Sequence, residues 1–491
     1  MRVAEKAISN TVYLFMQWII VTFFSFIYWL IAGKLLLPSD YGKVSTAFQL
    51  INLINLLTAF GLGGTISKLV PVYASKKEFG KISSLVRNCL KFSFTAAFLA
   101  GILFLLSYPF TSPYLKLDFF TYFLIFLGIL SARIHSIFSI TWYGLQRMDK
   151  MAKVSFAIQL IKVISSAMLI YLGLKHFGPI AALVFCFLAG ILLYFNPSFI
   201  EKPKKINFKR ILKELSFPIY LGALGWILVG NTQYIILTIL KSVKETGIYS
   251  LAFTICSQLA IIPMTFSRAL FPLISILSEK KQKETQSKLL TYALKYSLLI
   301  GLPSIAILYF FRNFIVLFMA RKEYLEASRY FALLAPSALT FGIANLLCVN
   351  LLALGYPKVF RNLRIFIAIL YFLTALTFTH FYAGMGLAIS YALLSLIYFF
   401  SSFYLVNKKV RIKIGKINLT KFLPIFVIFS FLLFLIDQAK LNIILKFLLF
   451  LASSLVYLFL SKTFVLTRED ERVLELIVKK ARQKFLKLKQ K

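Results

Sequence analysis

The feature that most constrains this chain is a series of apolar runs, each about 20 residues long, separated by short basic loops. A helix needs about 20 mostly apolar residues to cross the hydrocarbon core of a bilayer. Residues 251–277, for example, carry one charge only, that of Arg268. Hydrophobic residues make up 60% of the 491 residues, against roughly 45–50% in a soluble globular protein. The sequence therefore predicts an all-α polytopic membrane protein.

About fourteen transmembrane helices are expected from these runs. They cover approximately residues 10–33, 44–67, 89–109, 118–142, 154–173, 178–195, 217–240, 247–277, 293–318, 328–354, 365–380, 384–406, 422–437 and 442–461. The first run is not followed by a small-residue cleavage site, so we interpret it as the first span and not as a removable signal.

The basic residues predict how the chain is oriented in the membrane. The N-terminus, alternate loops such as 196–216 and 407–421, and the C-terminal tail contain most of the 56 Lys and Arg residues. Because cytoplasmic loops carry an excess of Lys and Arg, both termini are expected in the cytoplasm. The expected location of the chain is the plasma or inner membrane of the cell. In a soluble protein a net charge of +39 would suggest a nucleic-acid partner. Here topology explains the charge, and membrane lipids are the expected partners.

The tail, residues 463–491, differs from the rest of the chain. Thr467 and Asp470 have the spacing of a capping box, and apolar residues then recur at helical spacing from Leu474 to Leu488, opposite Lys and Arg. This pattern predicts a basic amphipathic helix in the cytoplasm. The helix could lie on an anionic inner leaflet, or it could be a solvated tail that stabilises the topology.

The chain also contains an internal repeat. Four residues of GKVSTAFQL match four of GIYSLAFTI at an offset of 205, namely Gly42, Ser45, Ala47 and Phe48 against Gly247, Ser250, Ala252 and Phe253. An even number of spans in each copy gives the two copies the same orientation, as in transporters built from parallel repeats. We expect an N-lobe of six spans (1–200), a C-lobe of six spans (201–410) and two extra spans (411–462) before the tail.

Two stretches resemble a known family. They are DYGKVSTAFQLINLINLLTAFGLGGTISKLVPVYASKKE, from Asp40, and GNTQYIILTILKSVKETGIYSLAFTICSQLAIIP, from Gly230. Both are similar to the corresponding regions of polysaccharide (O-antigen-type) flippases, in the multidrug/oligosaccharidyl-lipid/polysaccharide exporter superfamily that includes the MATE proteins. The resemblance implies two six-span lobes around a central cavity that opens alternately to each side. It also implies a substrate consisting of an oligosaccharide linked to a polyprenyl (pyro)phosphate.

Three basic residues lie inside predicted spans at a similar depth. Arg133, Lys162 and Arg268 are eight or nine residues from the inner ends of their spans, or roughly 12–14 Å at 1.5 Å per residue. None of the 17 acidic residues lies within a span away from its edges. A charge in hydrocarbon costs at least about 2.5 kcal/mol, so we expect these side chains to face a water-filled cavity and to bind the substrate's phosphates. Alternatively, they bond helix-end carbonyls or extend to the inner interface.

Polar residues on two spans are further candidates for substrate binding. Gln49, Asn52 and Asn55 follow one another at i+3 spacing, and Asn231 and Gln233 lie on the seventh predicted span. A row of amides can line a sugar-binding cavity, or it can bond neighbouring helices. His135 projects from a different helix face than Arg133, and we interpret it as a core histidine.

The function favoured by these features is that of a flippase without a cofactor. No phosphate-binding loop or metal-ligand cluster occurs, so ATP and metals are not expected. One alternative is a cation-coupled multidrug exporter, which needs a carboxylate in a span. Another is a membrane-embedded glycan polymerase or ligase, which usually needs a large outward loop for its catalytic residues. The outward loops expected here are short, and a transporter that is not an enzyme is the better interpretation.

Overall fold

The computed structural model describes residues 2–195, 203–217, 219–220, 230–279, 281–412, 415, 419–439 and 442–465, and these residues form helices and connecting turns without any strand. They fall into two compact units. Unit 1 contains residues 1–255, 313–330 and 361–394, and unit 2 contains residues 256–312, 331–360 and 395–491. The predicted N-lobe and C-lobe are continuous stretches of the chain, whereas each unit combines several separate segments. The division into lobes stays a prediction.

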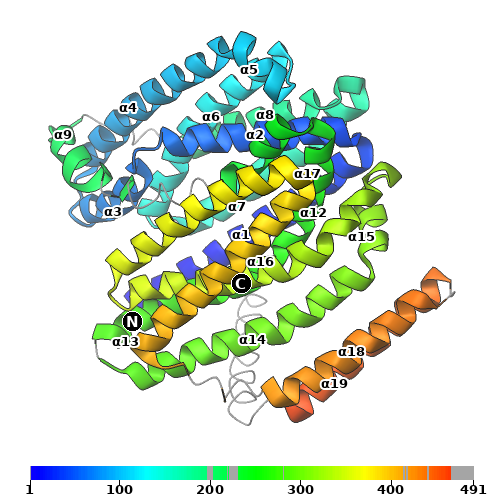
Figure 1. Ribbon diagram of the computed structural model, residues 1–491. Coiled ribbons are helices and arrows are strands. Elements are labelled where there is room, and N and C mark those ends of the chain that lie inside the picture. The colour runs from blue at the N-terminus through cyan, green and yellow to red at the C-terminus, as the bar shows by residue number, and fades with distance from the viewer. Residues whose placement is uncertain are drawn as a thin grey trace, which may run out of the picture. The chain divides into compact units, whose positions relative to one another are not determined.

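Unit 1 begins with the helices that precede residue 195. These are α1 (Arg2–Leu35), α2 (Pro38–Leu57), α3 (Leu62–Ser75), α4 (Phe79–Leu106), α5 (Tyr108–Leu115), α6 (Phe119–Gly144), α7 (Met148–Leu169), a π-helical turn η1 (Ile170–Leu174) and α8 (Phe177–Tyr194). In this bundle α7 packs against α1 and α8, and α6 packs against α8 and α4 (Figure 1). Leu62, Ile66 and Val70, spaced four apart on α3, enter its buried apolar core.

The rest of unit 1 comes from later in the chain. It comprises α9 (Phe208–Ile211), η3 (Leu212–Ser216), α11 (Gln233–Leu240), α12 (Val243–Cys256) up to Ile255, α15 (Arg312–Met319) from Asn313, η5 (Lys322–Tyr330) and the middle of α17 (Pro357–Val410). Helix α11 packs against α2.

The second predicted span is broken in the structure. Helices α2 and α3 are bent by 58° where Phe60 and Gly61 have φ angles of 44° and 71°. A Cβ atom added to Gly61 would lie 2.1 Å from the carbonyl oxygen of Ser216. Glycine therefore permits both the left-handed conformation and the close approach of η3.

Helix α17 contains the eleventh and twelfth predicted spans. Its backbone is non-helical at Ala383, where φ is 51° and ψ is −134°, so two helices meet there. Ten described helices are long and apolar enough to cross a membrane, or eleven if α2 and α3 count as one span. The part of α19 (Ile443–Phe464) from Leu448 to Phe464 is a shorter apolar helix, and most of the seventh predicted span lies outside the described residues. The prediction of an all-α polytopic chain is confirmed.

Unit 2 contains η4 (Ser257–Ala260), α13 (Ile261–Glu279), α14 (Lys283–Phe310), α16 (Phe331–Ala353), the two ends of α17, α18 (Leu419–Gln438) and α19 (Ile443–Phe464). Helix α13 packs on α16 and α14. Helices α18 and α19 form a hairpin, drawn orange to red in Figure 1, and α18 packs on α14. The Tyr457 hydroxyl of α19 donates to the carbonyl of Leu299 at 2.6 Å, which fixes the hairpin to α14. The predicted tail helix lies outside the described residues.

Two glycines let α2 and α12 cross in close contact. A Cβ on Gly42 would lie 1.9 Å from the carbonyl oxygen of Val243, and a Cβ on Gly247 would lie 1.8 Å from that of Pro38. Each residue of one pair is 205 positions from its counterpart in the other, so the two contacts are reciprocal. One turn further on, the Ser45 and Ser250 hydroxyls are hydrogen-bonded at 2.9 Å, again across an offset of 205. Residues related by a two-fold axis make contacts of this kind.

Candidate substrate-binding site

Arg133 is the predicted site residue whose surroundings are most informative. It lies on α6 with only 5% of its surface exposed, and its Nη2 donates to the backbone carbonyl of Asn55 on α2. The Asn55 Nδ2 donates to the carbonyl of Ile51 at 3.0 Å. The Nε atom of Arg133 and the Oδ1 atom of Asn55 are buried and have no hydrogen-bond partner among the described residues. The two residues therefore offer an unused donor and an unused acceptor close together.

Gln49 binds backbone groups of the segment that leads into α11. Its buried side chain donates from Nε2 to the carbonyl of Gly230 at 3.2 Å and accepts at Oε1 from the N–H of Tyr234 at 2.8 Å. Tyr234 is in the first turn of α11, where backbone N–H groups have no partner within the helix. Gln49 thus satisfies backbone groups on both sides of Thr232, where the helical conformation is interrupted.

Of the other predicted amides, Asn52 and Asn55 lie on α2 with Gln49, and Asn231 and Gln233 lie at or just before the start of α11. Gln233 is buried and accepts a long hydrogen bond, 3.5 Å, from the Tyr371 hydroxyl of α17. Asn52 and Asn231 are half-buried. The structure thus brings Asn55 to Arg133, and Gln49 to the segment that carries Asn231 and Gln233.

Lys162 lies in a different place, between α7 and α1. Only 6% of its surface is exposed, its Nζ donates to Ser25 Oγ at 3.3 Å, and the same atom is 5.0 Å from the ring centroid of Tyr28. A hydroxyl and an aromatic face both stabilise an ammonium group. Lys162 therefore has partners within the helix bundle in this conformation.

Arg268 lies in unit 2, on α13, and its side chain is exposed. Among the side chains of this helix that the structure describes, Pro263, Ser267 and Ile274 are buried, and α13 packs against α16 and α14. Arg268 makes no hydrogen bond or ion pair to any described residue. Of the three cations at similar predicted depth, it is the one that remains accessible.

The structure contains polar clusters that the sequence analysis did not find. Glu245 Oε1 accepts from the Tyr330 hydroxyl, from Arg329 Nη2 at 3.3 Å and from the backbone N–H of Gly384 at 3.3 Å. A second cluster joins His176 to Asp40 and Asp118. All of these residues lie at the span ends that the charge pattern of the loops predicts to face outward. These clusters could not be predicted from the sequence, because partners far apart in the chain become neighbours only in the fold.

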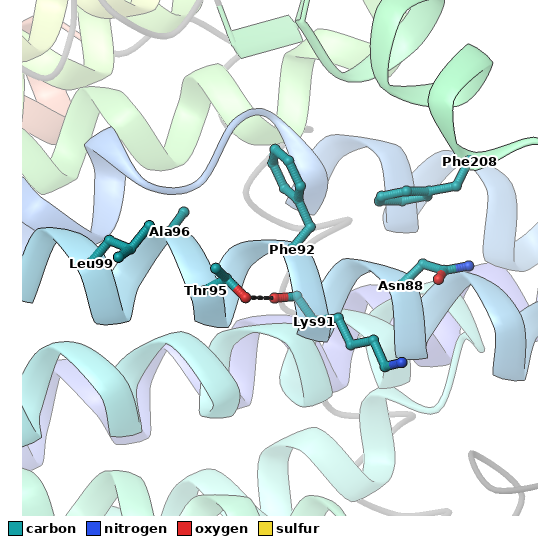
Figure 2. Close-up of a pocket in the computed structure, with 7 residues that line it drawn as sticks. All are labelled: Asn88, Lys91, Phe92, Thr95, Ala96, Leu99 and Phe208. Atoms are coloured by element: carbon teal, nitrogen blue, oxygen red, sulfur yellow. Dashed lines mark hydrogen bonds between the residues drawn. The ribbon is translucent and has the colours of Figure 1, made fainter.

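One surface hollow of about 470 Å³ lies on α4 beneath Phe208 of α9. Figure 2 shows that six of its seven lining residues follow one another along α4, while Phe208 comes from another segment. None of the eight predicted binding residues lines it. The hollow is therefore not the predicted substrate site.

The fold is that of a polytopic membrane transporter. A solved structure described as lipid II flippase MurJ in an inward closed conformation has a TM-score of 0.68 and 20% identity, and the match covers 92% of this chain and 98% of that one. An inward-facing multidrug resistance MATE family transporter of the MOP superfamily has a TM-score of 0.62 and 13% identity. That match covers 81% of this chain and 98% of the transporter. A MOP superfamily transporter from Pyrococcus furiosus has a TM-score of 0.55 and 12% identity, and the match covers 82% of this chain and 95% of that one.

Sequence profiles identify the family. The profile described as polysaccharide biosynthesis protein matches residues 7–278, more than half of the chain, and the one described as MatE matches residues 218–377. The chain therefore belongs to the polysaccharide biosynthesis protein family, a flippase and exporter family of the MOP superfamily, as the resemblance implied. No curated protein matches it in sequence.

Proposed function

We propose that this protein moves a polyprenyl-(pyro)phosphate-linked oligosaccharide from the inner to the outer leaflet of the cell membrane by alternating access. Membership of the polysaccharide biosynthesis family and the fold shared with a lipid II flippase support a substrate of this class. Both termini are cytoplasmic in this proposal. The chain acts as a transporter that carries out no chemical step.

The observation that carries the proposal is the state of the two arginines inside apolar helices. Arg133 keeps an unused donor at Nε, and Arg268 makes no ion pair or hydrogen bond to the described residues. A guanidinium binds a phosphate through two parallel hydrogen bonds, which makes arginine well suited to a diphosphate head group. Cations held in apolar helices without carboxylates are poor stabilising elements, and a phosphate substrate gives them a role.

The crossing of α2 and α12 supplies the second element of the mechanism. With Gly42 and Gly247 against opposing carbonyls and Ser45 bonded to Ser250, the predicted outer ends of these helices are in contact. We infer that this contact closes the outer side and that its separation opens the path for the sugar. The polyprenyl chain stays in the bilayer throughout, since it is apolar.

Replacement of Arg268 tests the proposal. Arg268→Ala should abolish surface display of the glycan in cells that lack the native protein, at matched membrane levels of each variant. Losing a charge-assisted bond costs about 2–3 kcal/mol, or roughly 30- to 150-fold in affinity. Arg268→Lys keeps the charge without the planar fork, and its display should fall between the two.

Lys446→Ala is the matched control, because it also removes a positive charge from a predicted span. The Lys446 Nζ donates to the carbonyl of Asp437 at 2.9 Å, at the end of the α18–α19 hairpin. Display should stay at the wild-type level. Full display by Arg268→Ala would contradict the proposed role of Arg268.

A further inference from the structure

His176 is held between two carboxylates from two other helices. Its Nδ1 lies 3.1 Å from Asp40 Oδ1 and its Nε2 lies 3.0 Å from Asp118 Oδ2, and the histidine itself is only 5% exposed. Asp40 is in the first turn of α2, Asp118 is the N-cap of α6, and His176 is the N-cap of α8. One imidazole thus connects the starts of three helices.

Hydrogen-bond chemistry fixes the protonation state that this geometry requires. An ionised carboxylate only accepts hydrogen bonds, and a neutral imidazole donates from one ring nitrogen only. Both contacts are therefore hydrogen bonds only when His176 is the doubly protonated imidazolium. In the neutral form, one ring nitrogen would present a lone pair to a carboxylate oxygen.

The ionised state of Asp118 is favoured by its surroundings. Burial raises the pKa of this carboxyl, but hydrogen bonds from the Thr121 N–H and hydroxyl and from His176 outweigh burial, so the pKa is below its usual value. Asp118 is thus an anion at any pH near neutrality. It also caps α6, where a negative charge is favourable at the positive end of the helix.

The position of His176 is otherwise unfavourable for a histidine. Histidine makes no side-chain cap hydrogen bond to α8, and an imidazolium at a helix N-terminus opposes the helix dipole. The two carboxylates compensate for this. Among the described residues, three further charged or titratable groups lie around the cluster. They are Lys43 of α2, 3.8 Å from Asp118, Lys175 next to His176, and Tyr324 of η5, which interacts electrostatically with Asp40.

We propose that His176 is a proton-binding site whose protonated form ties together the starts of α2, α6 and α8. The tie acts on the crossing of α2 and α12, because Asp40 is two residues before Gly42. A proton on His176 holds the start of α2 where Pro38 and Gly42 meet Val243 and Gly247. Since these helix ends are predicted to face outward, the proton exchanges with the external medium, and external acidity favours the closed crossing.

The sign of the pH dependence follows from the protonated form. Both contacts to the carboxylates need a proton on each ring nitrogen, so acid favours the tie and a rise in pH weakens it. The pKa of Asp118 is lowered, so stabilisation by its ionised carboxylate is present above the usual pKa of an aspartate and is lost only in strong acid.

The test is the Tm of the purified full-length chain in detergent between pH 5.5 and 8.5. The wild-type Tm should fall over this range, and His176→Gln should lose more than half of the fall, because glutamine does not titrate. His380→Gln is the matched control, since His380 is an exposed histidine at the same predicted end, and it should keep the wild-type profile. A wild-type profile for His176→Gln would overturn the proposal.

A second pair of variants decides the question if His176→Gln does not fold. Asp40→Asn and Asp118→Asn each keep an oxygen that accepts from the imidazole but remove one negative charge. With one anion fewer beside the imidazolium, the fall in Tm should move to lower pH in each. If neither profile moves, His176 is not the proton site. Because Tm is measured without substrate, this result is independent of the proposed transport.

Discussion

At the scale of single residues, Arg133 combines deep burial with an unused hydrogen-bond donor. Replacing a buried ion pair with apolar side chains of similar volume is often neutral, or stabilising by about 1–4 kcal/mol, because the desolvation penalty of the charges is removed. The same penalty applies to the buried guanidinium of Arg133. If Arg133 is kept for phosphate binding, Arg133→Met should leave the Tm unchanged or higher while surface display of glycan is lost. Thermal unfolding and display are measured on the same variant.

The exposed Arg147 provides the control for Arg133. It is the N-cap of α7 and pairs with Asp149 in the first turn of that helix at 3.1 Å. Arg147→Met should change neither Tm nor display by much, because exposed ion pairs contribute about 0–1 kcal/mol. A marked fall in Tm for Arg133→Met would instead assign Arg133 to packing between α6 and α2.

Single residues also show how far the sequence could be interpreted. The sequence alone identifies Arg133 and Arg268 as candidate site residues, because charged residues within apolar spans are rare and costly. The role of Gln49 is hidden in the sequence, because it depends on where the backbone of Gly230 and Tyr234 lies. The role of His176 is equally hidden in the sequence, since its carboxylate partners are 136 and 58 residues away in the chain.

At the scale of helices, the close crossing of α2 and α12 at Gly42 and Gly247 can be tested by disulfide formation. The Ser45→Cys and Ser250→Cys pair should form a disulfide readily, because the wild-type hydroxyls are 2.9 Å apart. Adding Gly247→Ala should reduce the disulfide yield about tenfold or more, since overpacking costs about 1–3 kcal/mol. Gly230→Ala is the control, because a Cβ there meets nothing within 4 Å. An undiminished yield with Gly247→Ala would mean that the helices do not cross in this way.

Helix existence was predictable and helix breaks were less so. Twenty apolar residues specify a span whatever their neighbours are. The bend after α2 contains glycine, which is a common signal, but Ala383 adopts a positive φ although alanine rarely does. Such a conformation is imposed by the surrounding packing, and a sequence pattern does not reveal it.

At the scale of the whole chain, the offset of 205 connects the sequence to the fold. Sequence matching found Gly42, Ser45, Gly247 and Ser250 as equivalent positions but did not indicate that they touch. Their reciprocal contacts are what a duplicated unit produces when its copies meet around a two-fold axis. The two six-span lobes and their boundaries stay a prediction that these contacts support.

The last prediction concerns orientation, on which both proposals depend. Single cysteines replacing Lys205 and Lys413 should react with an impermeant thiol reagent only from the cytoplasmic side, and one replacing Lys244 only from outside. The physical reason is the positive-inside rule, since Lys205 and Lys413 lie in the densest basic loops. The four native cysteines are free but buried, so their background reaction should be low. Labelling of Lys205→Cys from outside would invert the topology, and the His176 cluster would then sense cytoplasmic pH and Arg268 would lie nearer the outer leaflet.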